Sequence, residues 1–275
     1  MPKTKVLIAV KTYPTLSEKY DELVCSAGFR EDGSWIRIYP VPFRKLDYEG
    51  QYKKWQWIEI DLVKNESDFR PESFRPNNID EEIILLDKIG TENNWEKRKE
   101  IVLNNVWDNM AELIEDSKHT NNKTSLAVMK PKRIIDFVWE EVDREWNKDK
   151  LTKVIANQMQ TSLFEQEAKI FFKVVDKLPY EFSYKFITED GKERKLMIED
   201  WELGMLYWNC LKKANGDEKI ALNKVKEKYF DLFVNERDLY FFLGTTKKFH
   251  TMNSLNPFII IGTFWPKKEN QYKLF

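Results

Sequence analysis

The sequence predicts an α+β protein in which strands from both chain ends form one mixed, curved β-sheet or partial barrel, with several helices packed on it. Two observations lead to this prediction. Short apolar runs separated by turn residues dominate the N-terminal third, whereas the middle of the chain changes to a helical period. Two strand-like runs that each end in Gly-Thr, FFLGT and IIIGT, then close the chain.

The N-terminal third is rich in predicted strands. KVLIAV, residues 5–10, is the first of them. LVCSAGF and WIRIYPV flank the glycine-containing turn REDGS, which predicts a β-hairpin over residues 23–41. WQWIEIDLV alternates in the manner of a half-buried strand over residues 55–63. Pro40 and Pro42 interrupt ladder bonding and predict a strand end near Arg44.

The middle of the chain begins with a predicted helix over Trp95–Ser117, whose apolar residues recur at helical spacing. The polar segment Lys118–Thr124 follows. We expect a single α+β domain over residues 1–275, or two fused lobes that separate near 118–124.

Strands and helices then alternate to the C-terminus. Predicted strands cover residues 124–131, 133–142, 170–186 and 194–200, with a turn at EDGK and a helical or irregular stretch near 151–167. Predicted helices cover residues 201–213 and 217–233.

Composition limits the chemistry and the location. The chain has 275 residues, a formal net charge of −1, two cysteines and two histidines. Apolar runs are too short to cross a bilayer and the cysteines too few for a disulfide framework, so we expect a soluble, cytoplasmic protein without membrane contact. Cysteine and histidine are too dispersed for a zinc cluster, and P-loop, Rossmann and hydrolase-elbow motifs are absent from the sequence.

The two Gly-Thr runs suggest a binding rim. If the strands are neighbours, small residues at their ends permit close backbone approach by a ligand, and the connecting loop supplies positive charge. The segment 239–268 contains four lysines and no acid. The alternative is that the glycines relieve strand-end geometry and the lysines are solvated. The candidates here are Gly244, Thr245, Lys247, Lys248 and His250.

The segment SDFRPESFRP, residues 67–76, doubles an Arg-Pro unit. Proline makes it a rigid loop, and two guanidinium groups with a hydroxyl and a carboxylate suit recognition of a phosphate or a polar ring. The alternative is a structural loop whose arginines pair with nearby acids. The binding candidates here are Arg70, Ser73 and Arg75, and Glu72 is a candidate catalytic acid.

Acids also cluster in LMIEDWELG, where a strand changes to a helix. Asp200 and Glu202 suit an N-cap and a first helical turn, or alternatively a carboxylate pair of which one activates water. Aromatic residues interleaved with cations on the N-terminal strands suit base stacking beside phosphates, although strand packing also explains them. The binding candidates on those strands are Lys11, Tyr13, Arg37, Tyr39 and Arg44.

The stretches KTYP, WIRIYPVPFR, DFRPESFRP, IEDWELGMLYWNC, FFLGTTKKFH and PFIIIGTFWP together resemble a family of bacterial proteins associated with phage-defence gene clusters. In size and setting the chain is also similar to an anti-phage DNA glycosylase that excises glucosylated hydroxymethylcytosine. This resemblance implies DNA with modified bases, such as phage DNA, as the partner, but it assigns no residue roles.

The sequence and the resemblance together favour a DNA N-glycosylase that needs neither a metal ion nor a cofactor, because a carboxylate suffices for hydrolysis of a glycosidic bond. Two alternatives remain open at this point. One is a non-catalytic reader of modified nucleic acid or of a nucleotide. The other is a magnesium-dependent nuclease, which needs two or three converging acids.

Overall fold

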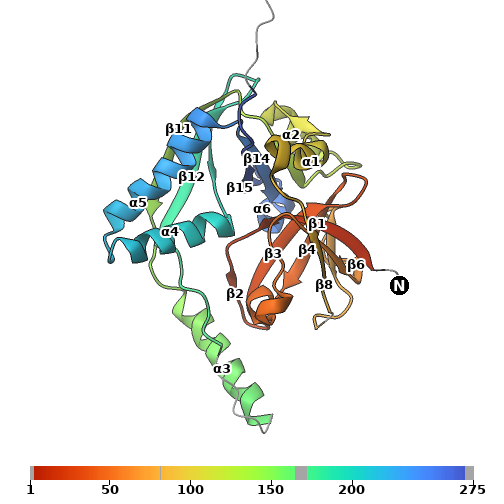
Figure 1. Ribbon diagram of the computed structural model, residues 1–275. Helices are drawn as coiled ribbons and strands as arrows, with labels where there is room; N and C mark the ends of the chain where they lie inside the picture. The colour runs from red at the N-terminus through yellow and green to blue at the C-terminus, as the bar shows by residue number, and fades with distance from the viewer. Residues whose placement is uncertain (1–2, 81, 165–171, 270–275) are drawn as a thin grey trace, which may run out of the picture. The chain divides into compact units, whose positions relative to one another are not determined.

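The computed structural model describes residues 3–80, 82–164 and 172–269 (Figure 1). The chain divides into two compact units, and each unit is discontinuous in sequence. Residues 1–88 and 139–181 form the first unit, and residues 89–138 and 182–275 form the second. The polar segment Lys118–Thr124 lies inside the second unit, where it leads to a strand that begins at Leu126.

The first unit is built on a curved sheet with the strand order β6-β7-β4-β3-β1-β5-β8, and β2 pairs with β3 beside that path. Antiparallel pairing joins β1 to both β3 and β5, whereas β4 and β7 are parallel. Its elements are β1 (Thr4–Lys11), β2 (Thr15–Ser17), β3 (Asp21–Phe29), β4 (Trp35–Val41), β5 (Gln56–Ile60), β6 (Leu62–Lys64), β7 (Ser73–Pro76), β8 (Ile84–Lys88) and α3 (Lys148–Phe164).

Alternation of side chains explains the core of the first unit. Val6, Ile8, Ile36, Ile38 and Ile58 lie on one face of paired strands and are almost completely buried. The predicted hairpin is confirmed, because β3 and β4 pair antiparallel across a turn in which Gly33 has a φ of 80°. A short 3₁₀ turn, Phe43–Lys45, follows β4 and confirms the strand end near Arg44.

The second unit contains a four-stranded sheet of order β15-β14-β10-β9, and the strands β11, β12 and β13 form a further sheet. Helices α4 and α5 pack against each other within this unit (Figure 1). Its elements are α1 (Glu92–Val102), β9 (Val106–Trp107), α2 (Met110–Lys118), β10 (Leu126–Met129), β11 (Arg133–Glu141), β12 (Tyr180–Ile187), β13 (Glu193–Met197), α4 (Trp201–Lys213), α5 (Glu218–Lys226), a π-helix (Glu227–Glu236), β14 (Tyr240–Thr245), α6 (Lys247–Thr251) and β15 (Phe258–Phe264). Strands β11 and β12 cross the sequence boundaries between the two units.

Aromatic side chains fill the core of the second unit. The Tyr184 and Phe241 rings stack at 5.1 Å, and Phe137 lies 5.8 Å from Phe182. These rings are fully buried, so most of the aromatic excess in this half of the sequence serves packing. None of the described helices has both the length and the apolar character needed to cross a membrane.

The α+β prediction is confirmed, but its account of the sheet needs a correction. Within the described residues, the N-terminal strands and the two Gly-Thr strands belong to separate sheets rather than to one shared sheet. β1 is already paired on both edges, by β3 and β5, and β14 is paired on both edges by β10 and β15. Neither end therefore offers the other an open edge at these strands.

The long helix predicted over Trp95–Ser117 is wrong, because two helices and a short strand occupy this stretch. The turn after α1 contains Asn104 and Asn105, and Asn109 begins α2 by accepting hydrogen bonds from the amides of Ala111 and Glu112. By contrast, the helix predicted over residues 201–213 is confirmed as α4. The strand predicted over residues 170–186 falls partly outside the described residues; of its described part, residues 172–179 are not a strand, and β12 begins only at Tyr180.

Candidate active site

The Arg-Pro loop of the first unit is held together by a buried ion pair. Asp68 accepts from Arg70 at 2.6 Å between Oδ2 and Nη2, and from Ser73 Oγ at 2.7 Å. Burial alone would raise the pKa of Asp68, but the hydrogen bonds from Arg70 and Ser73 outweigh it and hold that pKa well below its ordinary value. Arg70 and Ser73 thus stabilise the loop, as the structural alternative proposed.

The other candidates of this region divide between the interior and the surface. Arg37 is buried, and burial together with the nearby Arg70 lowers the pKa of its guanidinium. Its backbone amide donates to Glu72 O at 2.7 Å, which fixes β4 beside the loop. The Glu72 carboxylate is a local counter-charge that offsets part of this lowering of the Arg37 pKa. Arg75 is exposed, and its Nη1 donates to the backbone carbonyl of Pro76.

The candidates on the first strands mostly make contacts within the first unit. Tyr13 is buried, and its hydroxyl donates to Asp176 O at 2.7 Å. Arg44 binds Glu22 at 2.7 Å, and Lys11 Nζ lies 4.3 Å from the centre of the Phe43 ring. Tyr39 differs from these three, because 37% of it remains exposed.

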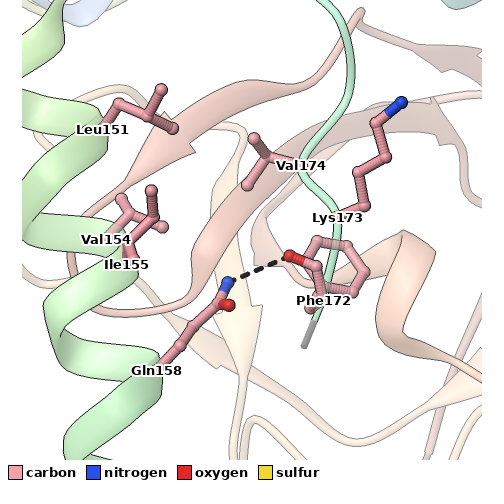
Figure 2. A pocket seen from close by; sticks show the side chains of 7 residues that line it. All are labelled: Leu151, Val154, Ile155, Gln158, Phe172, Lys173 and Val174. Atoms are coloured by element: carbon pink, nitrogen blue, oxygen red, sulfur yellow. Dashed lines mark hydrogen bonds between the residues drawn. The ribbon is translucent and has the colours of Figure 1, made fainter. Parts of the chain in front are cut away.

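The first unit also contains an apolar pocket of about 400 Å³ that sequence reasoning did not predict. Figure 2 shows it between one face of α3 and the segment 172–174, with Gln158 Nε2 donating to Phe172 O at 3.1 Å. Its lining is Leu151, Val154, Ile155, Gln158, Phe172, Lys173 and Val174. Lys173 is the one ionisable residue in that lining, so the pocket offers no acid–base pair for catalysis.

In the second unit, the acidic segment lies where β13 ends and α4 begins. Ile198 forms a parallel bridge with Ile260, and the Glu199 amide donates to Ile260 O at 2.8 Å. The next residue, Asp200, is buried and caps α4 by accepting from the Glu202 amide at 3.0 Å. The N-cap predicted from the sequence is therefore confirmed, and it gives Asp200 a structural task.

Glu199 is the ionisable group of this junction that sequence reasoning passed over as a catalytic candidate. Its side chain is half-buried, and desolvation by burial raises its pKa from the ordinary 4.5 to about 7. A carboxyl group that exchanges its proton near neutral pH suits general acid–base catalysis. Alternation along KLMIED could have singled it out, because Glu199 points away from the buried side that carries Ile198.

The pairing of strands places Glu199 beside the second Gly-Thr run, on β15. Paired residues share a face of a sheet and neighbours along a strand alternate, so Glu199 lies on the face that carries Ile259 and its partner Gly244. Asp200 and Glu202 share a neighbour, Tyr229. Burial raises the pKa of Tyr229 well above its ordinary value, and the charges of Asp200 and Glu202 add to that rise.

The two Gly-Thr strands are neighbours, as predicted, but they do not form one rim. They pair antiparallel, with Gly244 opposite Ile259 and Gly262 opposite Phe242, so their glycines lie at different levels of the ladder. A Cβ on Gly244 would lie 2.8 Å from Cδ1 of Ile261, which is closer than such contacts allow. Packing of Ile261 is therefore sufficient reason for this glycine.

The loop after β14 combines a buried histidine with exposed lysines. His250 is buried, with Nδ1 3.0 Å from Thr245 Oγ1 and Nε2 2.7 Å from Ser117 O. His250 and Thr245 thus face the interior rather than a phosphate. Lys247 and Lys248, on α6, are exposed. In the part of the chain that the structure describes, no group of three or more Asp, Glu, His and Cys residues could hold a metal ion.

Comparisons with known proteins give a family for most of the chain. Residues 106–275 match a family model described as a domain of unknown function, DUF8757, and residues 2–104 match one described as DUF8758. None of the curated proteins matches the sequence. One solved structure, described as "Structure of murine DNA binding protein bound with ds DNA", has 10% identity and a TM-score of 0.32, with coverage of 98% of this chain and 97% of that one. Similarity at this level establishes neither the fold nor the function of the present chain.

Proposed function

The chain belongs to the DUF8757 family, and we propose that it is an enzyme that hydrolyses N-glycosidic bonds in DNA with Glu199 as its acid–base group. One observation carries the proposal. A half-buried carboxyl group with a pKa of about 7 is fixed at a strand end, where the backbone of its own residue binds β15. An acid with a purely structural role usually has a lowered pKa, because an ion pair or a helix N-cap stabilises its charged form.

The proposed reaction uses Glu199 twice, first as an acid and then as a base. Protonated Glu199 donates its proton to the departing base while the C1′–N bond breaks and its electron pair goes to the base. Water then adds to the resulting oxocarbenium-like sugar, and the proton that it loses returns to the Glu199 carboxylate. The products are a free base and an abasic sugar, and the enzyme is restored. No metal ion enters any step.

DNA is the proposed substrate class because the reaction needs a base that can be extruded, and because two exposed lysines stand on α6, in the connection that leads to β15, to which the Glu199 amide is hydrogen-bonded. The resemblance of the sequence to proteins of phage-defence clusters extends the proposal to modified bases, including glucosylated bases of phage DNA. This finer identity rests on the resemblance, whereas the reaction type rests on Glu199.

Incubation with modified and unmodified phage DNA in the presence of a chelator tests the reaction. We expect abasic sites with the wild-type protein and at least a roughly hundredfold slower appearance with Glu199→Gln, which is the scale of general acid catalysis. Glu193→Gln is the matched control, since Glu193 is exposed and begins β13, the strand that leads to Glu199. Absence of abasic sites on every substrate would rule out the glycosylase.

A non-catalytic reader of modified nucleic acid is the second candidate. The observation that favours it is the exposure of two aromatic rings in the first unit, Tyr39 at 37% and Phe69 at 41%. A reader would bind modified DNA more tightly than unmodified DNA without releasing a base, and Tyr39→Ala with Phe69→Ala would remove that preference.

A further inference from the structure

The connection between β14 and β15 exposes three large apolar side chains. Phe249 is 45% exposed, Met252 66% and Leu255 93%. They follow one another at intervals of three residues, and polar residues such as Asn253 and Ser254 stand between them. Among the described residues of the second unit, only Ile220 joins them as an exposed large apolar side chain. So much exposed apolar surface on one short connection calls for a partner.

The base of this connection is fixed, although its tip is exposed. His250 ties α6 to the end of α2 through Ser117 O and to β14 through Thr245. Thr246 caps α6 by accepting from the Phe249 amide at 3.3 Å, and the Ser254 amide donates to Phe249 O at 3.1 Å. A buried histidine with contacts at both ring nitrogens holds the apolar residues in one place, which gives His250 a positioning role.

The charge around the exposed residues is positive. Lys247 and Lys248 precede Phe249, and the Lys248 ammonium lies 5.9 Å from the centre of its ring. Since the connection, residues 246–257, contains two lysines and no acid, it offers a polyanion both phosphate contacts and an apolar contact.

The same connection lies close to Glu199. The last pair of the β14–β15 ladder is Thr245 with Phe258, and the Glu199 amide binds Ile260, two residues further along β15. Two residues of a strand span roughly 7 Å. With the separation of about 5 Å between neighbouring strands, the Glu199 backbone lies roughly 9 Å from the root of the exposed connection.

We propose that Phe249, Met252 and Leu255 form a wedge that enters the base stack of duplex DNA and occupies the space left by the base extruded towards Glu199. This inference rests on the proposed function. Apolar side chains of these types unstack base steps in other DNA-binding proteins, and the enzyme needs such a device because its target atom lies inside the duplex. Lys247 and Lys248 would hold the phosphates on either side.

A membrane surface would also accept apolar residues beside lysines, but it is less suited to this connection. An interfacial helix presents a continuous apolar face, whereas α6 has only the five residues Lys247–Thr251, and two of the three apolar residues follow it in irregular chain. A narrow row of separate apolar side chains matches a base step better than a lipid surface.

The test uses duplex DNA that carries the fluorescent analogue aminopurine beside a modified base, with Glu199→Gln in every protein so that no base is released. We expect the aminopurine signal to rise on binding, and Phe249→Ala, Met252→Ala and Leu255→Ala together to reduce that rise at least roughly tenfold. Binding to single-stranded DNA should change less than about threefold, because the lysines remain. Ile220→Ala, an exposed apolar residue on α5, is the matched control and should leave the rise unchanged.

The outcomes separate the wedge from the hydrolysis. An unchanged aminopurine signal in the triple variant overturns the wedge, even if the wild-type protein makes abasic sites. Loss of the signal without abasic sites on any DNA supports the wedge and refutes the hydrolysis. Loss of binding to phosphatidylserine vesicles with DNA unstacking intact would assign the three residues to a membrane and overturn the proposal.

Discussion

The substitution Glu199→Gln should make the protein more stable at neutral and alkaline pH. The carboxyl has its pKa raised from 4.5 to about 7 by burial, so the folded state holds this proton more tightly than the unfolded chain does. Stability from this group is therefore complete below pH 4.5 and is lost as the pH rises to about 7. The shift corresponds to about 3 kcal/mol in the free energy of unfolding.

Glutamine has no proton to lose, so Glu199→Gln avoids this loss. The free energy of unfolding of the variant minus that of the wild type should rise by about 2.5 kcal/mol between pH 5 and pH 8, because part of the loss already occurs below pH 5. Urea unfolding of both proteins at these two pH values measures the difference, and titrations common to both proteins cancel. Glu193→Gln should show no comparable change. A difference that is the same at both pH values would refute the raised pKa, and with it the reason for choosing Glu199.

Further substitutions test the remaining site residues. Asp68→Asn leaves the charge of Arg70 buried without its carboxylate, so it should lower the free energy of unfolding, measured in urea, by about 3–5 kcal/mol. In the wild type the pKa of Asp68 is lowered, so the stability from this pair should be lost in acid, as the pH falls below the ordinary pKa of an aspartate. Asp200→Ala should lower the free energy of unfolding by about 1 kcal/mol, because the α4 cap is lost, whereas Asp200→Asn should keep both the cap and the activity. A loss of turnover in Asp200→Asn would show that Asp200 takes part in catalysis. Lys247→Glu with Lys248→Glu should weaken DNA binding on all sequences and flatten its salt dependence, and binding like that of wild type at ordinary salt would remove the lysines from the interface.

Local features of this fold were predictable from the sequence because their causes are local. Gly33 marks the turn of the β3–β4 hairpin, and Asp200 caps α4 with an amide two residues away. Partners of the strands at the two chain ends depend instead on which edges other strands have already taken. The sequence FFLGT does not indicate that β10 pairs with β14, and KVLIAV does not indicate that β5 pairs with β1.

The site was predicted less well than the fold, for a physical reason. Residue type and spacing made Asp200, Arg70 and His250 candidates for ligand contacts, but each of them is buried and makes a structural contact within the fold. For Glu199 the error was the opposite: it was not predicted as a catalytic candidate, although its environment in the fold suits one. Alternation along KLMIED places it on the opposite face from Ile198, but the sequence does not show its raised pKa, which arises because tertiary packing removes water from its carboxyl group.

The central claim is that Glu199 donates the proton that releases the base. The measurement that tests it most directly is the pH dependence of base release from modified DNA below saturation, in chelator, for the wild type and Glu199→Gln. The account predicts a rate that falls tenfold per pH unit above a bend near pH 7 in the wild type, and a slow rate without that bend in the variant. A wild-type rate that is flat or rising through pH 7, or a variant as fast as the wild type, would contradict it.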